Sequence, residues 1–243
     1  YPISGHWAWG GGFLQQLGFH DFAGGGVVHM AGGTAALAGA MILGPRLGKY
    51  NENRTSNAIQ GHSMALSALG VFILWIGWFG FNGSSTMGIS QSGDLEKVAN
   101  IFMNTALAGA ASGTITLLIS WFRYHKADIS MTLNGILAGL VAITPAAGTV
   151  SVLGAVCIGL LSSVVCFFMV AVVKPKFKYD DALDAFGVHG MGGIVGSILT
   201  GVFATRYISG EGGVEGVLYG DWHQLWVQVV ATAVSVVFSA AMT

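Results

Sequence analysis

Two copies of one short motif hold ionisable side chains that could bind a small polar solute or pass a proton. The motif is an aspartate, a histidine eight residues later, and glycines three and four residues after the histidine. An imidazole titrates near neutral pH and can donate and accept hydrogen bonds, so a pair of imidazoles is suited to proton relay. The copies are Asp21, His29, Gly32 and Gly33, and Asp181, His189, Gly192 and Gly193.

The composition indicates what kind of element carries these motifs. Only 9% of the 243 residues are charged, against about 25% in an average soluble domain, and 53% are hydrophobic. The formal net charge is −1 and no basic stripe is present, which argues against a nucleic-acid partner. A chain of this kind has either an unusually large core or a membrane around it.

Seven apolar runs are long enough to cross a hydrocarbon layer of about 30 Å as helices, which takes about 20 residues. None contains Lys, Arg, Asp or Glu, whose burial at the bilayer centre costs at least about 2.5 kcal/mol. The runs cover residues 22–44, 62–82, 98–122, 129–147, 150–173, 185–205 and 224–243. The sequence therefore predicts an all-α polytopic membrane protein with seven transmembrane helices.

The basic residues give these spans a direction. If the spans alternate, the loops at 45–61, 123–128 and 174–184 share one side and carry eight of the ten basic residues, leaving Lys97 and Arg206 on the other. The positive-inside bias places the eight in the cytoplasm, the start of the chain outside and its end inside. The eight are Arg46, Lys49, Arg54, Arg123, Lys126, Lys174, Lys176 and Lys178.

The two motifs lie on spans of opposite direction, which is typical of the inverted repeats of membrane transporters. Eight residues of helix place each histidine about 12 Å below its own membrane surface. His29 and His189 should therefore meet near the midplane. Ionisable groups at that depth usually mark a substrate or proton path. The many glycines around them are expected to form helix contact faces.

Aromatic side chains gather near the expected outer end of this path. The second span contains Trp78 and Phe81 and is followed by Ser85, and the first twenty residues, expected to form an extracellular loop, contain Trp9. An aromatic face beside a hydroxyl can hold a small cation. Asp21 is expected to cap its helix and to stabilise such a cation.

The corresponding acidic residues at the inner end are expected to differ from Asp21. Asp180, Asp181 and Asp184 are interpreted as solvated loop and cap residues. Asp181 is expected to match Asp21 in position without the same burial.

Four stretches of this chain resemble the ammonium transporter family, the Amt branch of the Amt/Mep/Rh superfamily. They are DFAGGGVVHMAGG (21–33), LWIGWFGFNGSS (74–85), ITPAAG (143–148) and DDALDAFGVHGMGGIVGSILTGVFA (180–204). Members have eleven spans, in a five-plus-five inverted repeat with one further helix, and form homotrimers. The resemblance implies that this chain corresponds to spans five to eleven, a single partial transporter domain over residues 1–243 that was cut from a longer protein.

The resemblance also implies roles for seven residues. Trp9 and Ser85 would recruit ammonium outside, and Asp21 would be a buried carboxylate required for transport. Phe81 would be a gate ring, and Trp78 would line the pore. His29 and His189 would be the twin pore histidines. The other aromatic residue of the recruitment site and the second gate ring belong to a helix before residue 1. A PII-class signal protein can dock at the cytoplasmic face of such proteins.

The resulting prediction is a cell-membrane protein that recruits ammonium, deprotonates it and conducts ammonia past the two histidines, without a cofactor or metal ion. The competing prediction is an ammonium sensor that signals to a cytoplasmic effector. A retinal protein is excluded because its Schiff base needs an intramembrane lysine, and no predicted span contains one. An enzyme is disfavoured because the sequence has no nucleophile–base motif or phosphate loop.

Overall fold

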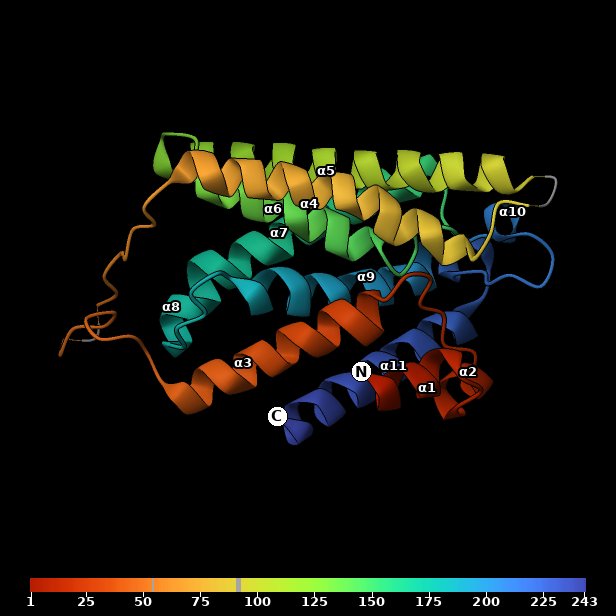
Figure 1. Ribbon diagram of the computed structural model, residues 1–243, viewed down its shortest axis with the longest axis horizontal. Helices are drawn as coiled ribbons and strands as arrows, with labels where there is room; N and C mark the ends of the chain where they lie inside the picture. The colour runs from red at the N-terminus through yellow and green to blue at the C-terminus, as the bar shows by residue number, and fades with distance from the viewer. Residues whose placement is uncertain (54, 91–92) are drawn as a thin grey trace.

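The computed structural model describes residues 1–53, 55–90 and 93–243, and its regular elements over these residues are helices (Figure 1). Arg54, predicted to belong to the basic inner loop, lies outside the described residues. The elements in chain order are α1 Pro2–Trp9, α2 Phe13–Leu17, η1 Gly25–Met30, α3 Ala31–Leu43, α4 Met64–Gly83, η2 Ser84–Thr86, α5 Asp94–Tyr124, α6 Ile129–Ile143, α7 Val152–Phe168, η3 Met169–Val173, α8 Lys174–Phe177, η4 Phe186–Gly190, α9 Met191–Phe203, α10 Arg206–Ser209, η5 Val217–Tyr219 and α11 Trp222–Met242.

Six helical stretches among the described residues are long and apolar enough to cross a membrane. They are Gly25–Leu43, Met64–Thr86, Asp94–Tyr124, Val152–Phe177, Phe186–Phe203 and Trp222–Met242. A further apolar helix, α6, has 15 residues and ends at Ile143. It ends there because Pro145 has no N–H to continue the helical hydrogen-bond pattern. The seventh span therefore stays a prediction, whereas the all-helical class is confirmed over the described residues.

The first twenty residues, expected to form an extracellular loop, contain two short helices that the sequence did not indicate. Gly10, Gly11 and Gly12 separate α1 from α2, and Gly11 adopts a positive φ of 81°. Apolar side chains of this segment, such as Leu14, are buried together with Val227 of α11. This burial supports the helices although the segment is too short and too polar to be a span.

The basic loops share one end of the helical bundle. Figure 1 shows the chain after α3, the connection between α5 and α6, and the segment after α8 at the same end, with α1, α2 and α10 toward the other. The alternation of direction that was expected from the apolar runs is thus seen in the fold.

An ion pair at this end corrects the expectation that the inner aspartates are solvated. The Arg46 guanidinium donates two hydrogen bonds to Asp180, with its Nε 2.7 Å from Oδ2 and an Nη 2.8 Å from Oδ1. Asp180 and Asp181 are both buried, and Asp184 is paired with Lys174. The sequence could not show this ion pair because Asp180 and Arg46 are more than a hundred residues apart along the chain.

The Arg46 guanidinium lowers the pKa of Asp180 to about 2, from 3.8 in the absence of partners. A carboxyl group whose pKa is lower in the folded than in the unfolded state stabilises the folded protein at pH values above the unfolded pKa. This stabilisation is lost as the pH falls through the folded pKa. We therefore expect Arg46→Ala to lower stability by about 1 kcal/mol at pH 7, since the guanidinium is half exposed and screened by water. The difference from wild type should shrink between pH 4 and pH 2 in detergent-solubilised protein followed by thermal unfolding. A pH-independent difference would contradict this.

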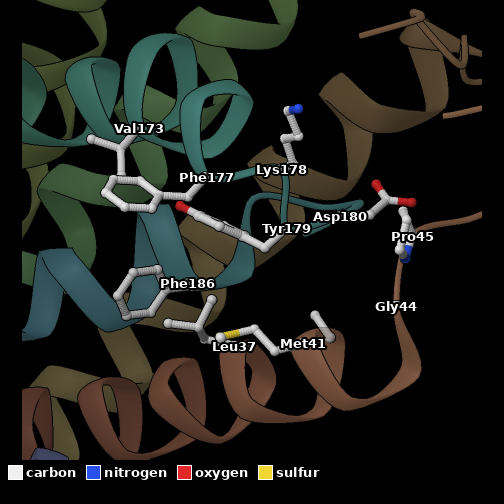
Figure 2. A pocket seen from close by; sticks show the side chains of 11 residues that line it. Leu37, Met41, Gly44, Pro45, Val173, Phe177, Lys178, Tyr179, Asp180 and Phe186 are labelled. Atoms are coloured by element: carbon white, nitrogen blue, oxygen red, sulfur yellow. The ribbon is translucent and has the colours of Figure 1, made fainter. Parts of the chain in front are cut away.

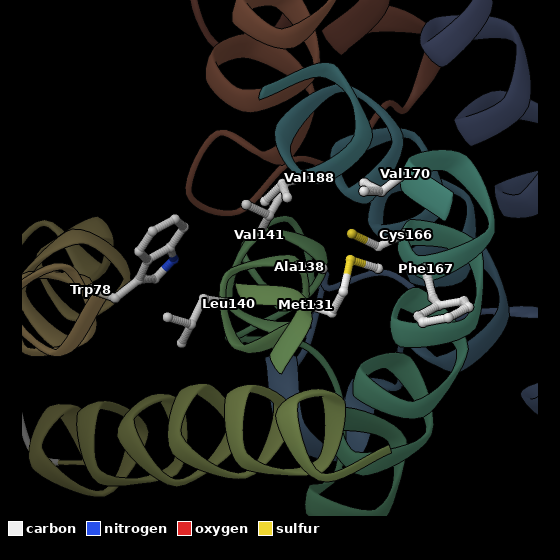
Figure 3. Close-up of a cluster of buried hydrophobic side chains, with 9 residues drawn as sticks. All are labelled: Trp78, Met131, Ala138, Leu140, Val141, Cys166, Phe167, Val170 and Val188. Atoms are coloured by element: carbon white, nitrogen blue, oxygen red, sulfur yellow. The ribbon is translucent and has the colours of Figure 1, made fainter. Parts of the chain in front are cut away.

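A buried apolar cluster lies beside the two histidines (Figure 3). It brings together side chains of α4, α6, α7, η3 and η4. Its members are Trp78, Met131, Ala138, Leu140, Val141, Cys166, Phe167, Val170 and Val188. Because Val188 precedes His189 and Trp78 faces His29, this core fixes the surroundings of both histidines.

Glycines bring the two motif-bearing helices together at backbone distance. A Cβ added to Gly33 would lie 2.1 Å from the backbone nitrogen of Gly190. A Cβ added to Gly193 would lie 2.4 Å from the carbonyl oxygen of Gly25. Neither position can hold a side chain, as expected for helices that pack through small residues. The prediction that these glycines form contact faces is confirmed at these positions.

Candidate functional site

The two histidines meet across the repeat interface. The Nδ1 atoms of His29 and His189 lie 3.3 Å apart, within hydrogen-bond reach, so one ring donates its N–H and the other accepts. His29 lies in η1 and His189 in η4, and both segments are π-helical. The sequence prediction that the imidazoles meet is confirmed. A pair joined in this way can relay a proton, since a proton bound by the outer nitrogen of one ring lets that ring pass its shared proton to the other, which then releases one from its own outer nitrogen.

Aromatic rings enclose the histidine pair on one side. Trp78 stacks on His29 with ring centroids 5.0 Å apart and an interplanar angle of 17°, and it also lies parallel to His189. Phe81 lies 5.3 Å from His29. The Trp78 indole N–H donates to the hydroxyl of Thr144 at 2.9 Å, which fixes the plane of the ring. The passage beside the imidazoles is therefore apolar.

Asp21 is a buried cap that gathers the start of η1. Its carboxylate accepts hydrogen bonds from the backbone N–H groups of four consecutive residues at 2.8 to 2.9 Å. The donors are Gly24, Gly25, Gly26 and Val27. With 4% of its surface exposed, the residue is enclosed by protein. It positions the helix that bears His29, and its charge can act on a nearby cation through space.

A cavity of about 670 Å³ lies at the end of the bundle where α1 begins. Four residues singled out in the sequence line it, namely Trp9, Asp21, Phe81 and Ser85. The Trp9 indole N–H donates to the carbonyl of Asp21 at 2.7 Å, which leaves the face of the ring for a cation. The structure thus brings together the residues of the expected cation site, and we call this space the outer cavity.

A second cavity, of about 370 Å³, reaches His189 from the opposite end. Its lining includes Ser67, Ser130, Asn134 and Asp184. We call this space the inner cavity. Because His29 contacts both Phe81, which lines the outer cavity, and His189, which lines the inner one, the histidine pair lies between the two.

A third cavity, of about 460 Å³, lies between α3 and α8 and is mostly apolar (Figure 2). Leu37 and Met41 line it from α3, and Phe177 and Phe186 from the facing side. Its described lining contains neither histidine. This cavity is therefore separate from the path through the histidine pair.

Comparison with known proteins decides what kind of chain carries this site. The family model described as "Ammonium Transporter Family" matches residues 1–243. The chain belongs to the ammonium transporter family. Members of this family are transporters rather than enzymes, in agreement with the sequence.

Individual relatives support the family and show how much of them the chain represents. The chain is 45% identical to the ammonium transporter of Aquifex aeolicus over 243 residues, covering all of this chain and 54% of that protein. It is 43% identical to that of Bacillus subtilis, covering 57% of it. The chain thus spans about half the length of the curated family members it matches.

Solved structures of family members share the fold. A protein described as "Sensor Amt Protein" superimposes with a TM-score of 0.90 at 36% identity, covering the whole chain and 59% of that protein. Candida albicans Mep2 superimposes with a TM-score of 0.88, also at 36% identity, covering 98% of this chain and 52% of that one. The helices described above therefore form part of the fold of this family.

Two polar groups near this site were missed in the sequence. Asn134 and Lys174 bind the carboxylate of Asp184 at the inner cavity. Asp184 itself was singled out in the sequence, and its place in the repeat, three residues after Asp181 as Gly24 is three residues after Asp21, could have drawn attention to its partners. Asn134 carried no such signal.

Proposed function

We propose that the protein containing this chain transports ammonium across the cell membrane. The observation that carries the proposal is the histidine pair between an outer cavity with an aromatic wall and an inner cavity that several polar side chains line in part. Family membership supports ammonium as the substrate. The basic loops would face the cytoplasm, with residue 1 outside and residue 243 inside.

In this mechanism ammonium binds over the face of Trp9 with a hydrogen bond to Ser85, and the charge of Asp21 stabilises it from within the protein. Phe81 and Trp78 form an apolar passage in which a desolvated cation is costly, whereas neutral ammonia needs only a hydrogen-bond partner. Ammonium therefore gives up its proton near Phe81, either to water of the outer cavity or to the imidazole of His29. Ammonia then passes His29 and His189, whose joined rings provide partners and a route for the proton.

The proposal includes the arrangement expected from the resemblance. The seven helices would form spans five to eleven of an eleven-span subunit, with the site completed by aromatic residues of a preceding helix. Subunits would associate as homotrimers, and a PII-class protein would dock on the basic loops.

Methylammonium uptake tests this function. Proteoliposomes that contain the full-length protein should take up labelled methylammonium in a saturable manner, and ammonium should compete. Uptake no greater than that of empty liposomes would overturn the proposal. An inward current during an ammonium concentration jump would assign proton relay to the histidine pair, and uptake without current would assign conduction of ammonia alone.

A second candidate function is ammonium sensing. It is favoured by the superposition on a structure described as "Sensor Amt Protein". A full-length protein that continues into a kinase or cyclase domain and shows ammonium-dependent effector activity without uptake would support sensing over transport.

A further inference from the structure

The inner cavity contains a carboxylate whose charge is compensated from two sides. Lys174 forms an ion pair with Oδ1 of Asp184, and the side-chain amide of Asn134 donates to Oδ2 at 2.7 Å. Asp184 is the only carboxylate among the described residues that line this cavity. The Lys174 and Asp184 side chains are 16% and 14% exposed, so water screens the pair only in part.

This carboxylate is present in the inner copy of the repeat and has no counterpart in the outer copy. Asp184 and Gly24 occupy matching positions, and both adopt the left-handed conformation, with φ of 56° and 107°. Glycine takes this conformation without cost, whereas an L-residue pays up to about 1–2 kcal/mol. An aspartate is therefore retained where a glycine would fit the backbone better.

The outer copy has no room for the corresponding side chain. A Cβ on Gly24 would lie 2.7 Å from Val28 and 3.4 Å from the Trp9 ring. At the outer end of the path, the Trp9 ring therefore lies over the position that corresponds to the ion pair of Asp184 and Lys174 at the inner end. The two ends of the path differ in cation chemistry although the backbone around them is repeated.

We propose that Lys174 is a release-determining residue, which neutralises Asp184 so that the inner cavity does not retain cations. The inference rests on the proposed transport function, in which ammonia reaches this cavity and is protonated there. An unpaired carboxylate in a partly desolvated cavity would attract the ammonium that forms. Fast conduction requires sites that are weak enough to leave. With the ion pair intact, the charge of Asp184 is neutralised and does not hold the product in the inner cavity.

The test measures inhibition of uptake by substrate on the inner side. Right-side-out membrane vesicles that contain the full-length protein are loaded with unlabelled methylammonium, and initial uptake of labelled methylammonium is measured from outside. Lys174→Met should lower, by about tenfold, the internal methylammonium concentration at which uptake falls to half. This is a conservative figure for the effect of an unpaired charge near a cation. The maximal rate should fall, while the outer KM should not change.

Two further variants separate release from folding. Asp184→Asn leaves Lys174 unpaired and should raise the half-inhibiting internal concentration, so the two substitutions act in opposite directions. Lys174→Met combined with Asp184→Asn should restore a value near that of wild type, as should Lys174→Arg. Equal losses in both single variants, with no change in internal inhibition, would make the pair structural and overturn the inference. If the wild type shows no uptake, it is the transport proposal that fails.

Discussion

Replacing Asp21 with alanine in the full-length protein is expected to abolish methylammonium uptake. The carboxylate accepts hydrogen bonds from four consecutive backbone N–H groups at the start of η1, and the residue is buried. Each buried donor left without a partner costs about 1–3 kcal/mol, so the first turn of η1 should rearrange and displace His29. Loss of the charge also weakens the outer cation site. Labelled uptake in proteoliposomes measures the result.

Asp181→Ala is the matched control for this substitution. Asp181 holds the equivalent position at the inner end but accepts only from Ala185 and Phe186, at 2.8 Å each. We expect it to reduce uptake less, since fewer donors lose their partner and the outer cation site stays intact. Both variants should elute in size-exclusion chromatography as the wild type does. Normal uptake by Asp21→Ala would reduce Asp21 to a helix cap without a role in transport.

Gly33→Ala is expected to have the other large effect. Its Cβ would lie 2.1 Å from the nitrogen and 2.4 Å from the Cα of Gly190, and both are backbone atoms that cannot move independently. Helix α3 must therefore separate from η4, at a cost of about 3 kcal/mol. The separation pulls His29 away from His189, because the carbonyl carbon of His189 is the next atom in contact. We expect a lower melting temperature together with a loss of most uptake.

The neighbouring residue provides the control. A Cβ on Gly32 meets nothing within 4 Å, so Gly32→Ala changes only the helix propensity. This variant should keep wild-type uptake and melt at the same or a slightly higher temperature, since alanine is favoured over glycine in a helix by about 1 kcal/mol. Similar losses in both variants would show that the close contact at Gly33 is not what holds the histidines together.

Much of this fold could be predicted because its strongest signals are local. A run of apolar residues without charges predicts a span directly, and six such helices are present. The helix α6 is less clear because its apolar run continues past Ile143 into a buried turn. There, Asn104 donates hydrogen bonds to the carbonyls of Ala147 and Val150, at 3.0 and 2.9 Å, and so satisfies a backbone that is not helical. No local pattern indicates such a partner.

The candidate site shows the same division. The contact between His29 and His189 was predicted from the repeated motif and from the opposite directions of the two spans that carry it, and both are visible in the sequence. The ion pairs of Asp180 and Asp184 were not predicted, because each depends on a cation from another segment, Arg46 or Lys174. Charged residues near a loop look solvated until their partners are known. Long-range pairing, rather than residue type, decided their environment.

The π-helical geometry of η1 and η4 restricts how this chain can change in evolution. A π-helical turn holds one residue more than the α-helical hydrogen-bond pattern allows. Deleting a single residue between Asp21 and His29 would remove this extra residue and change the position of the imidazole relative to its partner. The two copies differ in side chains within this interval, as at Gly24 and Asp184, but not in its length. The eight-residue interval between the aspartate and the histidine thus sets the position of the imidazole in both halves.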